Sequence, residues 1–302
     1  MAELTTIRAA SMEEAMQQAG LQVPPSLPPG KLVRFRTAGS SRSGWAKRFA
    51  DGRGGVFGDW ITDERYLWLS DTGEPFDEAG RELIRQQAEL ARQRYEREQR
   101  RRQAQAARTA ADIWAQAEPV SDHPYLRAKG IQPGWHLGPV RQYRGQLVIP
   151  VLALSGGNTG EIVSLQFIAP SGGKRFLSGG RVQGAGWLMH ARDCDGEIFI
   201  CEGWATAVTL GNAFFPGAQV VAAFNAGNLV DVALAIRTQC PKARLTIAAD
   251  NDHRTRGNPG LTKAREAAAA TGARIFYPDK AALGTGTDFN DLYLTQKEGA
   301  TE

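Results

Sequence analysis

The alternation of short apolar runs with helical segments in the C-terminal part of the chain restricts its fold most narrowly. The helices are expected between the runs, at residues 204–213, 228–239 and 260–272. Strands that alternate with helices of this length predict a parallel sheet covered by helices. In such sheets ligands bind beyond the carboxyl ends of the strands. The apolar runs are EIFICE (197–202), QVVAAF (219–224), ARLTIAAD (243–250) and ARIFYP (273–278).

Acidic residues follow the ends of these predicted strands. Glu202 ends the first run, Asp250 ends the third, and Asp252 comes two positions later. Because the carboxyl ends of parallel strands share an edge, these three carboxylates should gather there and repel one another unless a cation lies between them. Oxygen ligands without His or Cys favour Mg²⁺ or Mn²⁺ over zinc, and such ions assist phosphoryl transfer. Each carboxylate alone is equally consistent with a loop residue or a helix cap, so the order of the motifs carries the inference.

Three motifs in this order resemble the Toprim family, in the form found in plasmid and phage primases. They are CEGWATAVTL (201–210), IAADNDHRTRGNPGLTKAREAA (247–268) and GTDFNDLY (286–293). The upstream segments PYLRAKGI, VIPVLAL, IVSLQFIAPSGGKRFL and FNAGNL extend the resemblance over about residues 120–295. The resemblance implies an α/β, Rossmann-like Toprim domain with a mainly parallel sheet flanked by helices, preceded by a mixed α+β subdomain.

The resemblance also implies roles for individual residues. Glu202 would be a general acid/base or metal-site carboxylate, Asp250 and Asp252 would bind Mg²⁺ or Mn²⁺, and Asp288 would help a second ion. A second group would contact nucleotide or nucleic acid, or orient the loop at 287–293; it comprises Lys174, Arg175, Arg181, Asn290 and Asp291.

The activity implied by the resemblance is synthesis of short RNA primers on single-stranded DNA from ribonucleoside triphosphates, in plasmid or phage replication. Two alternatives stay open: a Toprim nuclease that uses the same carboxylates, and a non-catalytic DNA-binding replication factor. The chain has no cysteine before Cys194, which excludes an N-terminal zinc ribbon. It has no GxxxxGK[ST] motif, so any replicative helicase that acts with it must be a separate chain.

Residues 1–74 predict a small β-rich module with a short helix capped by Ser11. Its aromatic residues form the core of that module or stack on bases, and the sequence leaves both interpretations open. These residues are Trp45, Phe49, Phe57, Trp60 and Trp68.

Residues 75–118 predict one long helix between this module and the subdomains at 119–195 and 196–302. From Arg81 to Arg108 the segment holds nine Arg, no Lys and four Glu, a net charge of +5. A solvated linker stabilised by Glu–Arg pairs and a rod that contacts phosphates are both consistent with this composition.

Composition adds weaker limits. A net charge of +4 and a pI near 9.0 permit a polyanionic partner without requiring one. No apolar run is long enough to cross a membrane, and the polar N-terminus argues against a secretion signal. Three cysteines without CxxC spacing predict reduced thiols in a cytoplasmic protein, with Cys201 buried in the core.

Overall fold

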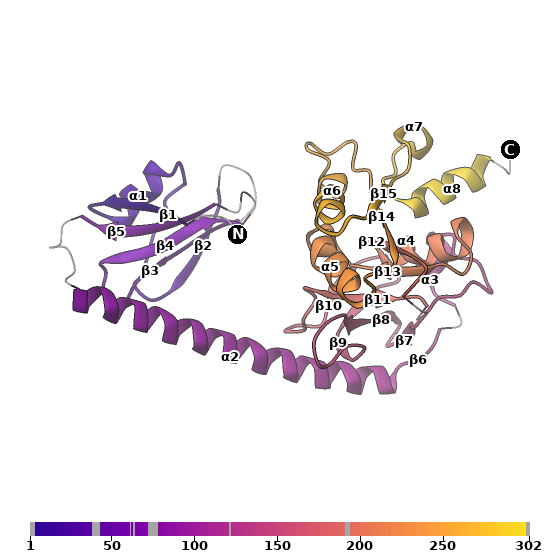
Figure 1. Ribbon diagram of the computed structural model, residues 1–302, viewed down its shortest axis with the longest axis horizontal. Coiled ribbons are helices and arrows are strands. Elements are labelled where there is room, and N and C mark those ends of the chain that lie inside the picture. Colours follow the sequence, from indigo (N-terminus) through magenta and orange to yellow (C-terminus); the bar gives the residue numbers. More distant parts are fainter. Residues whose placement is uncertain are drawn as a thin grey trace. The chain divides into compact units, whose positions relative to one another are not determined.

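The computed structural model describes residues 4–37, 43–60, 62, 64–71, 78–120, 122–190 and 194–299. The chain forms two compact units, residues 1–91 and 92–302, and each is described by itself. Figure 1 labels their elements. None of the helices in the described ranges has the length and apolar character needed to cross a membrane.

The first unit is a five-stranded sheet with one covering helix. Helix α1 (Met12–Gln18) packs Met12 and Met16 against Ala46, Phe57 and Trp68 on one face of the sheet. The order is β1-β5-β4-β3-β2, with β1 parallel to β5 and the other neighbours antiparallel. The strands are β1 (Leu4–Ala9), β2 (Leu32–Phe35), β3 (Gly44–Arg48), β4 (Gly54–Asp59) and β5 (Arg65–Ser70).

The predicted cap of the first helix is confirmed. The Ser11 side chain accepts a hydrogen bond of 3.1 Å from the Glu14 backbone N–H, while the Ser11 backbone is extended. This is the arrangement that satisfies a free N–H in the first turn of a helix.

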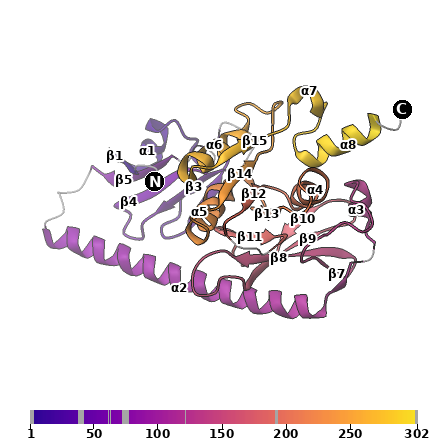
Figure 2. The ribbon, with the colours of Figure 1, turned by 45° about the vertical axis from the view of Figure 1, so that its right-hand side comes forward.

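Helix α2 (Glu78–Gln116) is a single long helix, and its second half packs on the sheet of the second unit. Ala110 is fully buried against Val148, Leu165 and Phe167. Arg141 donates to the Trp114 carbonyl oxygen at 2.7 Å and lies 4.6 Å from the centre of the Trp114 ring. Figures 1 and 2 both show this half of α2 alongside β9. The C-terminal half of the predicted linker is therefore part of a folded layer.

The second unit contains a ten-stranded sheet that follows the order β10-β9-β8-β11-β13-β12-β14-β15, with β7 also paired to β8 and β6 to β7. Strands β13, β12, β14 and β15 are parallel, and β10, β9, β8 and β11 are joined by antiparallel pairs. The strands are β6 (Glu118–Pro119), β7 (Arg141–Tyr143), β8 (Gln146–Ala153), β9 (Ile162–Ile168), β10 (Lys174–Phe176), β11 (Ala185–Leu188), β12 (Glu197–Cys201), β13 (Gln219–Ala222), β14 (Arg244–Ala248) and β15 (Arg274–Phe276).

Helices cover both faces of the parallel part, as Figures 1 and 2 show. Helices α5 and α6 enclose one core with Ile200 and Ile247, and α3, α4 and α8 enclose the other with Phe199 and Cys201. The α/β class, with a sheet flanked by helices, is confirmed. The helical elements are α3 (Pro124–Ala128), α4 (Trp204–Thr209), the π-helical η1 (Leu210–Phe214), the 3₁₀ turn η2 (Ala226–Asn228), α5 (Leu229–Gln239), α6 (Pro259–Thr271), α7 (Lys280–Leu283) and α8 (Phe289–Gly299).

Antiparallel strand β11 joins the two predicted subdomains of this unit. It pairs with β8 on one side and with β13 on the other, so the sheet continues across residue 195. The subdomain boundary at 195/196 therefore lies between adjacent elements of one layer and stays a prediction.

The cysteines differ from the sequence expectation in one respect. Cys194 and Cys240 form a disulfide across 46 positions, with their Cα atoms 4.7 Å apart, so the prediction that all three thiols are reduced is wrong. The sequence did not indicate this disulfide, because the spacing of Cys194 and Cys240 matches no motif. The two residues meet only because α5 and the strands around it bring them together. Cys201 is fully buried at the end of β12, as predicted.

Candidate active site

Glu202 follows directly after β12 and precedes the helix α4. Its carboxylate accepts a hydrogen bond from the Ala226 backbone N–H, but its Oε1 atom is buried without a hydrogen-bond partner. Burial and the neighbouring Asp252 and Asp288 carboxylates raise the pKa of Glu202 to about 7, and the bond from Ala226 only partly opposes this rise. The side chain is therefore poised to exchange a proton near neutral pH.

Asp250 lies two residues beyond the end of β14, beside β12 in the sheet. Its Oδ1 atom is buried and has no hydrogen-bond partner. Burial, then Glu202, then the carboxylates of Asp288, Asp252 and Asp291, raise the pKa of Asp250 well above its ordinary value. The predicted meeting of carboxylates at the edge of the parallel sheet is thus present for Glu202 and Asp250.

Asp252 is held in the loop that enters α6. Its Oδ2 atom accepts a 2.9 Å hydrogen bond from the Gly260 backbone N–H, in the first turn of that helix. Asn258, in a left-handed conformation (φ 41°), accepts from the Asp252 and Leu261 backbone N–H groups. A Cβ atom at Gly260 would lie 2.7 Å from the Asp250 carbonyl oxygen and 3.0 Å from Asp252 Oδ2. Asp252 therefore also serves as a helix cap, which the sequence had left open, and glycine at 260 permits the close approach.

Asp288 has a partner at each oxygen. Thr206 Oγ1 donates to Asp288 Oδ2 at 2.9 Å, and the Asp291 backbone N–H donates to Asp288 Oδ1 at 2.9 Å. Asp288 therefore joins α4 to the first turn of α8, and its carboxylate adds negative potential at Glu202 and Asp250.

Asn290 and Asp291 connect α8 to the C-terminal end of α3. The fully buried Asn290 side chain donates to the Lys129 carbonyl oxygen at 2.8 Å and to Thr209 Oγ1 at 2.9 Å. Asp291 accepts from the Thr287 backbone N–H at 2.9 Å and lies 3.5 Å from Lys129 Nζ. Both residues orient the loop in this structure, and contact with nucleotide stays a prediction for them.

Unpartnered oxygens at Glu202 and Asp250 fit a divalent cation. A carboxylate oxygen can only accept, and burying it without a donor or cation costs free energy. Among the described residues, no three His, Cys, Asp or Glu side chains lie close enough together to hold an ion in this conformation. Mg²⁺ usually takes one or two carboxylates and completes its shell with water and substrate phosphates. The donor set therefore fits an ion that arrives with a phosphorylated substrate better than a closed structural site.

Lys174 and Arg175 are adjacent on β10 and lie in different environments. Lys174 Nζ is 5.9 Å from the centre of the Tyr125 ring. Desolvation and the nearby Lys129 lower the pKa of Lys174, while the carboxylates of Asp288, Asp250 and Asp291 oppose this. Lys174 thus belongs to the surroundings of the carboxylates.

Arg175 points toward a different part of the unit. Its guanidinium lies 4.3 Å from the centre of the Phe167 ring and donates to Gln146 Oε1 at 3.0 Å. Phe167 belongs to the apolar cluster under α2, so Arg175 is on the α2 side of the sheet. The alternation of side chains along a strand separates the two predicted basic residues.

Arg181 lies in the segment between β10 and β11. Its Nε and Nη2 atoms are buried without a hydrogen-bond partner. Asn228 holds the same segment, because its Nδ2 atom donates to the carbonyl oxygens of Val182 and Ala185.

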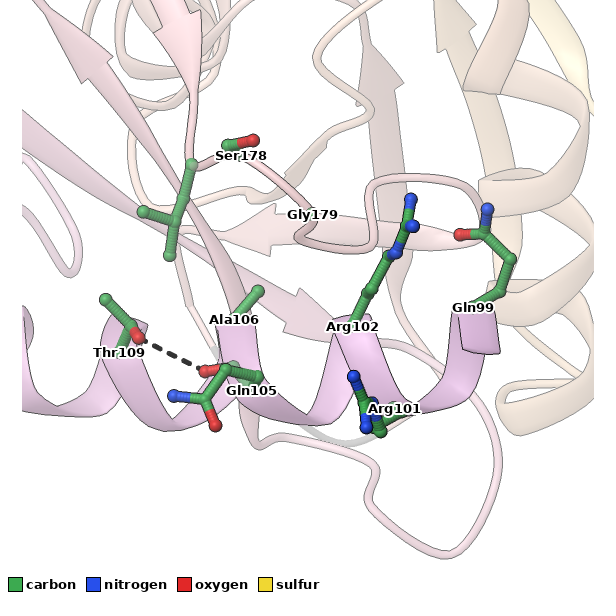
Figure 3. A pocket seen from close by; sticks show the side chains of 9 residues that line it. Gln99, Arg101, Arg102, Gln105, Ala106, Thr109, Ser178 and Gly179 are labelled. Carbon is green, nitrogen blue, oxygen red and sulfur yellow. Dashed lines mark hydrogen bonds between the residues drawn. The ribbon is translucent and has the colours of Figure 1, made fainter. Parts of the chain in front are cut away.

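A cavity of about 750 Å³, lined by both polar and apolar side chains, lies between α2 and the loop that follows β10. Figure 3 shows the side chains of Gln99, Arg102 and Gln105 on α2 and, opposite them, the side chain of Ser178 and the loop at Gly179. Arg101 and Arg102 both pair with Glu98, at 3.5 and 3.0 Å, so one carboxylate offsets part of their charge.

Two residues near the carboxylates were given no role by sequence reasoning. Tyr125 has a buried hydroxyl without a partner, and burial with Asp288 and Asp291 raises its pKa. Lys129 faces Asp291. Both belong to PYLRAKGI (124–131), which contributed to the resemblance. Nothing in the sequence indicated that this segment would lie near Asp288 and Asp291, about 160 positions later.

The geometry and the sequence together define a class of protein domain. Residues 197–300 match the family model of the Toprim domain, and this span contains β12 to β15 and the carboxylates Glu202, Asp250, Asp252, Asp288 and Asp291. This part of the chain is a Toprim domain.

The chain is also related to curated primases. It is 32% identical to DNA primase TraC of Escherichia coli over 284 residues, which are 88% of this chain and 26% of that protein. A second Escherichia coli protein of the same name is 32% identical over 222 residues, 70% of this chain and 15% of that protein. The chain thus spans about a quarter or less of the length of these relatives. The primase fragment of the bacteriophage T7 primase-helicase protein aligns with 58% of the chain at 15% identity and a TM-score of 0.40, covering 66% of that fragment, which is too weak to support a conclusion.

Proposed function

We propose that this chain is a DNA primase that synthesises short RNA primers on single-stranded DNA, in plasmid or phage replication. The observation that carries the proposal is the pair of buried, unpartnered carboxylate oxygens on Glu202 and Asp250 at the edge of a Toprim sheet. The relation to DNA primase TraC over most of the chain supports this activity rather than another Toprim chemistry.

The reaction joins two ribonucleotides aligned on the template. The 3′-hydroxyl oxygen of one forms a bond to the α-phosphorus of the other, and the bond from that phosphorus to the bridging oxygen of the β-phosphate breaks. Pyrophosphate leaves with the bonding electron pair, and the hydroxyl proton must be accepted by a base. The ionised Glu202 carboxylate can accept it, since its pKa is about 7.

The remaining residues would position the ion and the triphosphate. Asp250 and Asp252 would hold Mg²⁺ or Mn²⁺, with Asp288 in support. When bound, the ion neutralises phosphate charge and favours departure of pyrophosphate. Lys174 stands beside the carboxylates and would attract the triphosphate.

The template would lie along basic residues outside the carboxylate cluster. Arg175 and Arg181 belong to this group, as do Arg101 and Arg102 at the cavity of Figure 3. Contacts of this kind hold the phosphate backbone without reading sequence. A replicative helicase on a separate chain and a location in the cytoplasm remain part of the proposal.

The test is primer synthesis by the purified protein. Single-stranded DNA, labelled ribonucleotides and Mg²⁺ or Mn²⁺ are incubated with the wild type and with Asp250→Asn. Short labelled RNA from the wild type alone supports the proposal. Loss of the DNA, dependent on metal and on Asp250, would instead identify a nuclease.

A non-catalytic DNA-binding factor gives a third result. It binds the template but yields neither RNA nor cleavage, with either ion and with a replicative helicase added. That outcome would overturn the proposal while leaving the Toprim fold unaffected.

A further inference from the structure

The five-stranded sheet of the first unit has one face that α1 does not cover. Alternate residues of the strands point to this face, which we call the outer sheet face. Phe35, Ala46 and Phe57 point to the opposite side and are buried with α1. The register places Arg34 beside Trp45 and Lys47 beside both Leu32 and Val56 on the outer sheet face.

An exposed tryptophan, Trp60, and a half-buried one, Trp45, form an aromatic platform there. The ring centres of Trp45 and Trp60 are 5.4 Å apart, and Trp60 is 54% exposed. A Cβ atom at Gly58 would lie 3.0 Å from Cζ2 of Trp45, so the indole of Trp45 rests directly against the backbone of β4. Glycine at 58 thus allows one indole to lie close to the sheet, with the other beside it.

The structure shows which of the aromatic residues in this unit belong to its core and which lie on its surface, a distinction that the sequence left open. Phe57 and Trp68 are buried at 0% and 2% exposure within the core under α1. Trp45 and Trp60 lie outside that core. Burial in the core therefore explains why positions 57 and 68 hold aromatic residues. It does not explain why position 60 holds a large, exposed indole.

The charged side chains at the outward positions of the described strands are all basic. Arg8, Arg34 and Lys47 are exposed, and they belong to the outward positions of β1, β2 and β3. The outward positions of the described strands hold no Asp or Glu. Asp59 points inward and is buried. The Glu64 carboxylate is close enough to the inward-pointing Tyr66 to raise its pKa, after the larger effect of burial. A surface with indoles and cations but without carboxylates is complementary to a chain of unpaired bases and phosphates.

We propose that the outer sheet face binds single-stranded DNA, with bases stacked on Trp60 and Trp45 and phosphates beside Arg34 and Lys47. This is a second nucleic-acid site, separate from the carboxylates of the Toprim domain. A duplex fits it poorly, because its bases are already stacked on one another. The proposal goes beyond primer synthesis and does not depend on it.

The first measurement is the fluorescence anisotropy of a fluorescein-labelled oligothymidylate of about 15 nucleotides, the upper range that one single-strand-binding fold covers. The full chain is used, without ribonucleotides or divalent cation, so that failure to bind is distinguishable from failure of primer synthesis. Trp60→Ala should raise the Kd about tenfold, as expected for the loss of one stacked base. Leu234→Ala, which truncates another exposed apolar side chain on α5, should leave the Kd unchanged.

The charge is tested by the double variant Arg34→Glu/Lys47→Glu. Each lost phosphate contact should reduce the slope of log K against log salt by about 0.7. The control Lys242→Glu makes the same kind of charge change at an exposed position before β14. Both variants alter surface side chains, so circular dichroism should show an unchanged fold.

Two further probes separate stacking from simple charge attraction. An abasic oligomer of the same length should compete poorly, and a duplex should compete less well than the single strand at equal phosphate concentration. Equal binding by the wild type and Trp60→Ala, or equal competition by the abasic oligomer, overturns the proposal. So does a Trp60-dependent self-association of the protein that DNA does not displace, since a second copy would then be the occupant.

Discussion

Thr206 Oγ1 donates a 2.9 Å hydrogen bond to Asp288 Oδ2, joining α4 to the start of α8 across 82 positions of sequence. Because the Asp291 backbone N–H occupies the other oxygen, the protein itself satisfies Asp288. Glu202 and Asp250 each keep an unpartnered buried oxygen. Of these three carboxylates, Asp288 is thus fixed by hydrogen bonds within the fold, whereas Glu202 and Asp250 each have an oxygen free to bind a ligand.

Thr206→Val should destabilise the protein. It leaves a partly buried carboxylate oxygen with one donor fewer, and a hydrogen bond to a charged group contributes about 1.5–3 kcal/mol to the free energy of unfolding. Urea denaturation measures the change. Thr206→Ser keeps the hydroxyl and should recover most of the loss, whereas equal loss in both variants would attribute it to packing.

Asp250→Asn should abolish primer synthesis and keep the fold. The substitution removes a buried carboxyl group whose ionisation its surroundings disfavour, so the free energy of unfolding should stay the same or rise. Activity should fall about 100-fold or more, because the ion loses a ligand. Glu266→Gln on the surface of α6 provides the control for a neutralised carboxylate, since Glu266 only pairs with Lys263. A folded Asp250→Asn protein with full activity would contradict the assignment.

The metal-free protein should lose stability as the pH rises from about 4.5 to 7. The pKa of Glu202 is raised from 4.5 to about 7 in the folded chain, so the folded state binds more protons than the unfolded state across this window. Its stabilising effect is complete below the unfolded pKa and is lost through the folded pKa. Asp250 acts in the same direction. Glu202→Gln should flatten the pH dependence of the unfolding midpoint, and an unchanged slope would refute this origin.

Mg²⁺ should stabilise the protein more at pH 8 than at pH 5, because the pKa of Asp250 is raised well above its ordinary value and protons therefore compete with the ion for its carboxylate. At a concentration about 100 times its Kd, a ligand that binds only the folded state adds about 2.7 kcal/mol to the free energy of unfolding. Differential scanning calorimetry with Mg²⁺, compared with K⁺ at equal ionic strength, measures the shift. Asp250→Asn should remove it.

Gly260→Ala should impair both stability and activity. Its Cβ atom would meet the Asp250 carbonyl oxygen and Asp252 Oδ2, and such overpacking costs about 1–3 kcal/mol. Gly196→Ala is the matched control, because nothing lies within 4 Å of a Cβ atom there. Chemical denaturation and primer synthesis should show the loss at 260 and not at 196.

Local sequence patterns predicted the elements that depend on local interactions. Ser11 caps α1 because a hydroxyl three residues before a free N–H needs no distant partner. The strands that became β12 and β14 were predicted with nearly correct ends, since buried parallel strands appear as short apolar runs between helices. Strand β11 was missed, because its four residues include a glycine and its two partners lie far away in sequence.

The sequence by itself determined the order of the carboxylates, since strand and helix periods fix which residues follow each strand at the shared edge of a parallel sheet, and three motifs carried the resemblance to the Toprim family. Only the tertiary structure decided how each group is used. Asp288 is satisfied by Thr206, whereas Asp250 is not, and Trp60 is exposed, whereas Trp68 is buried. These outcomes depend on desolvation and on partners from distant segments, and neither is encoded in the spacing of residues along the chain.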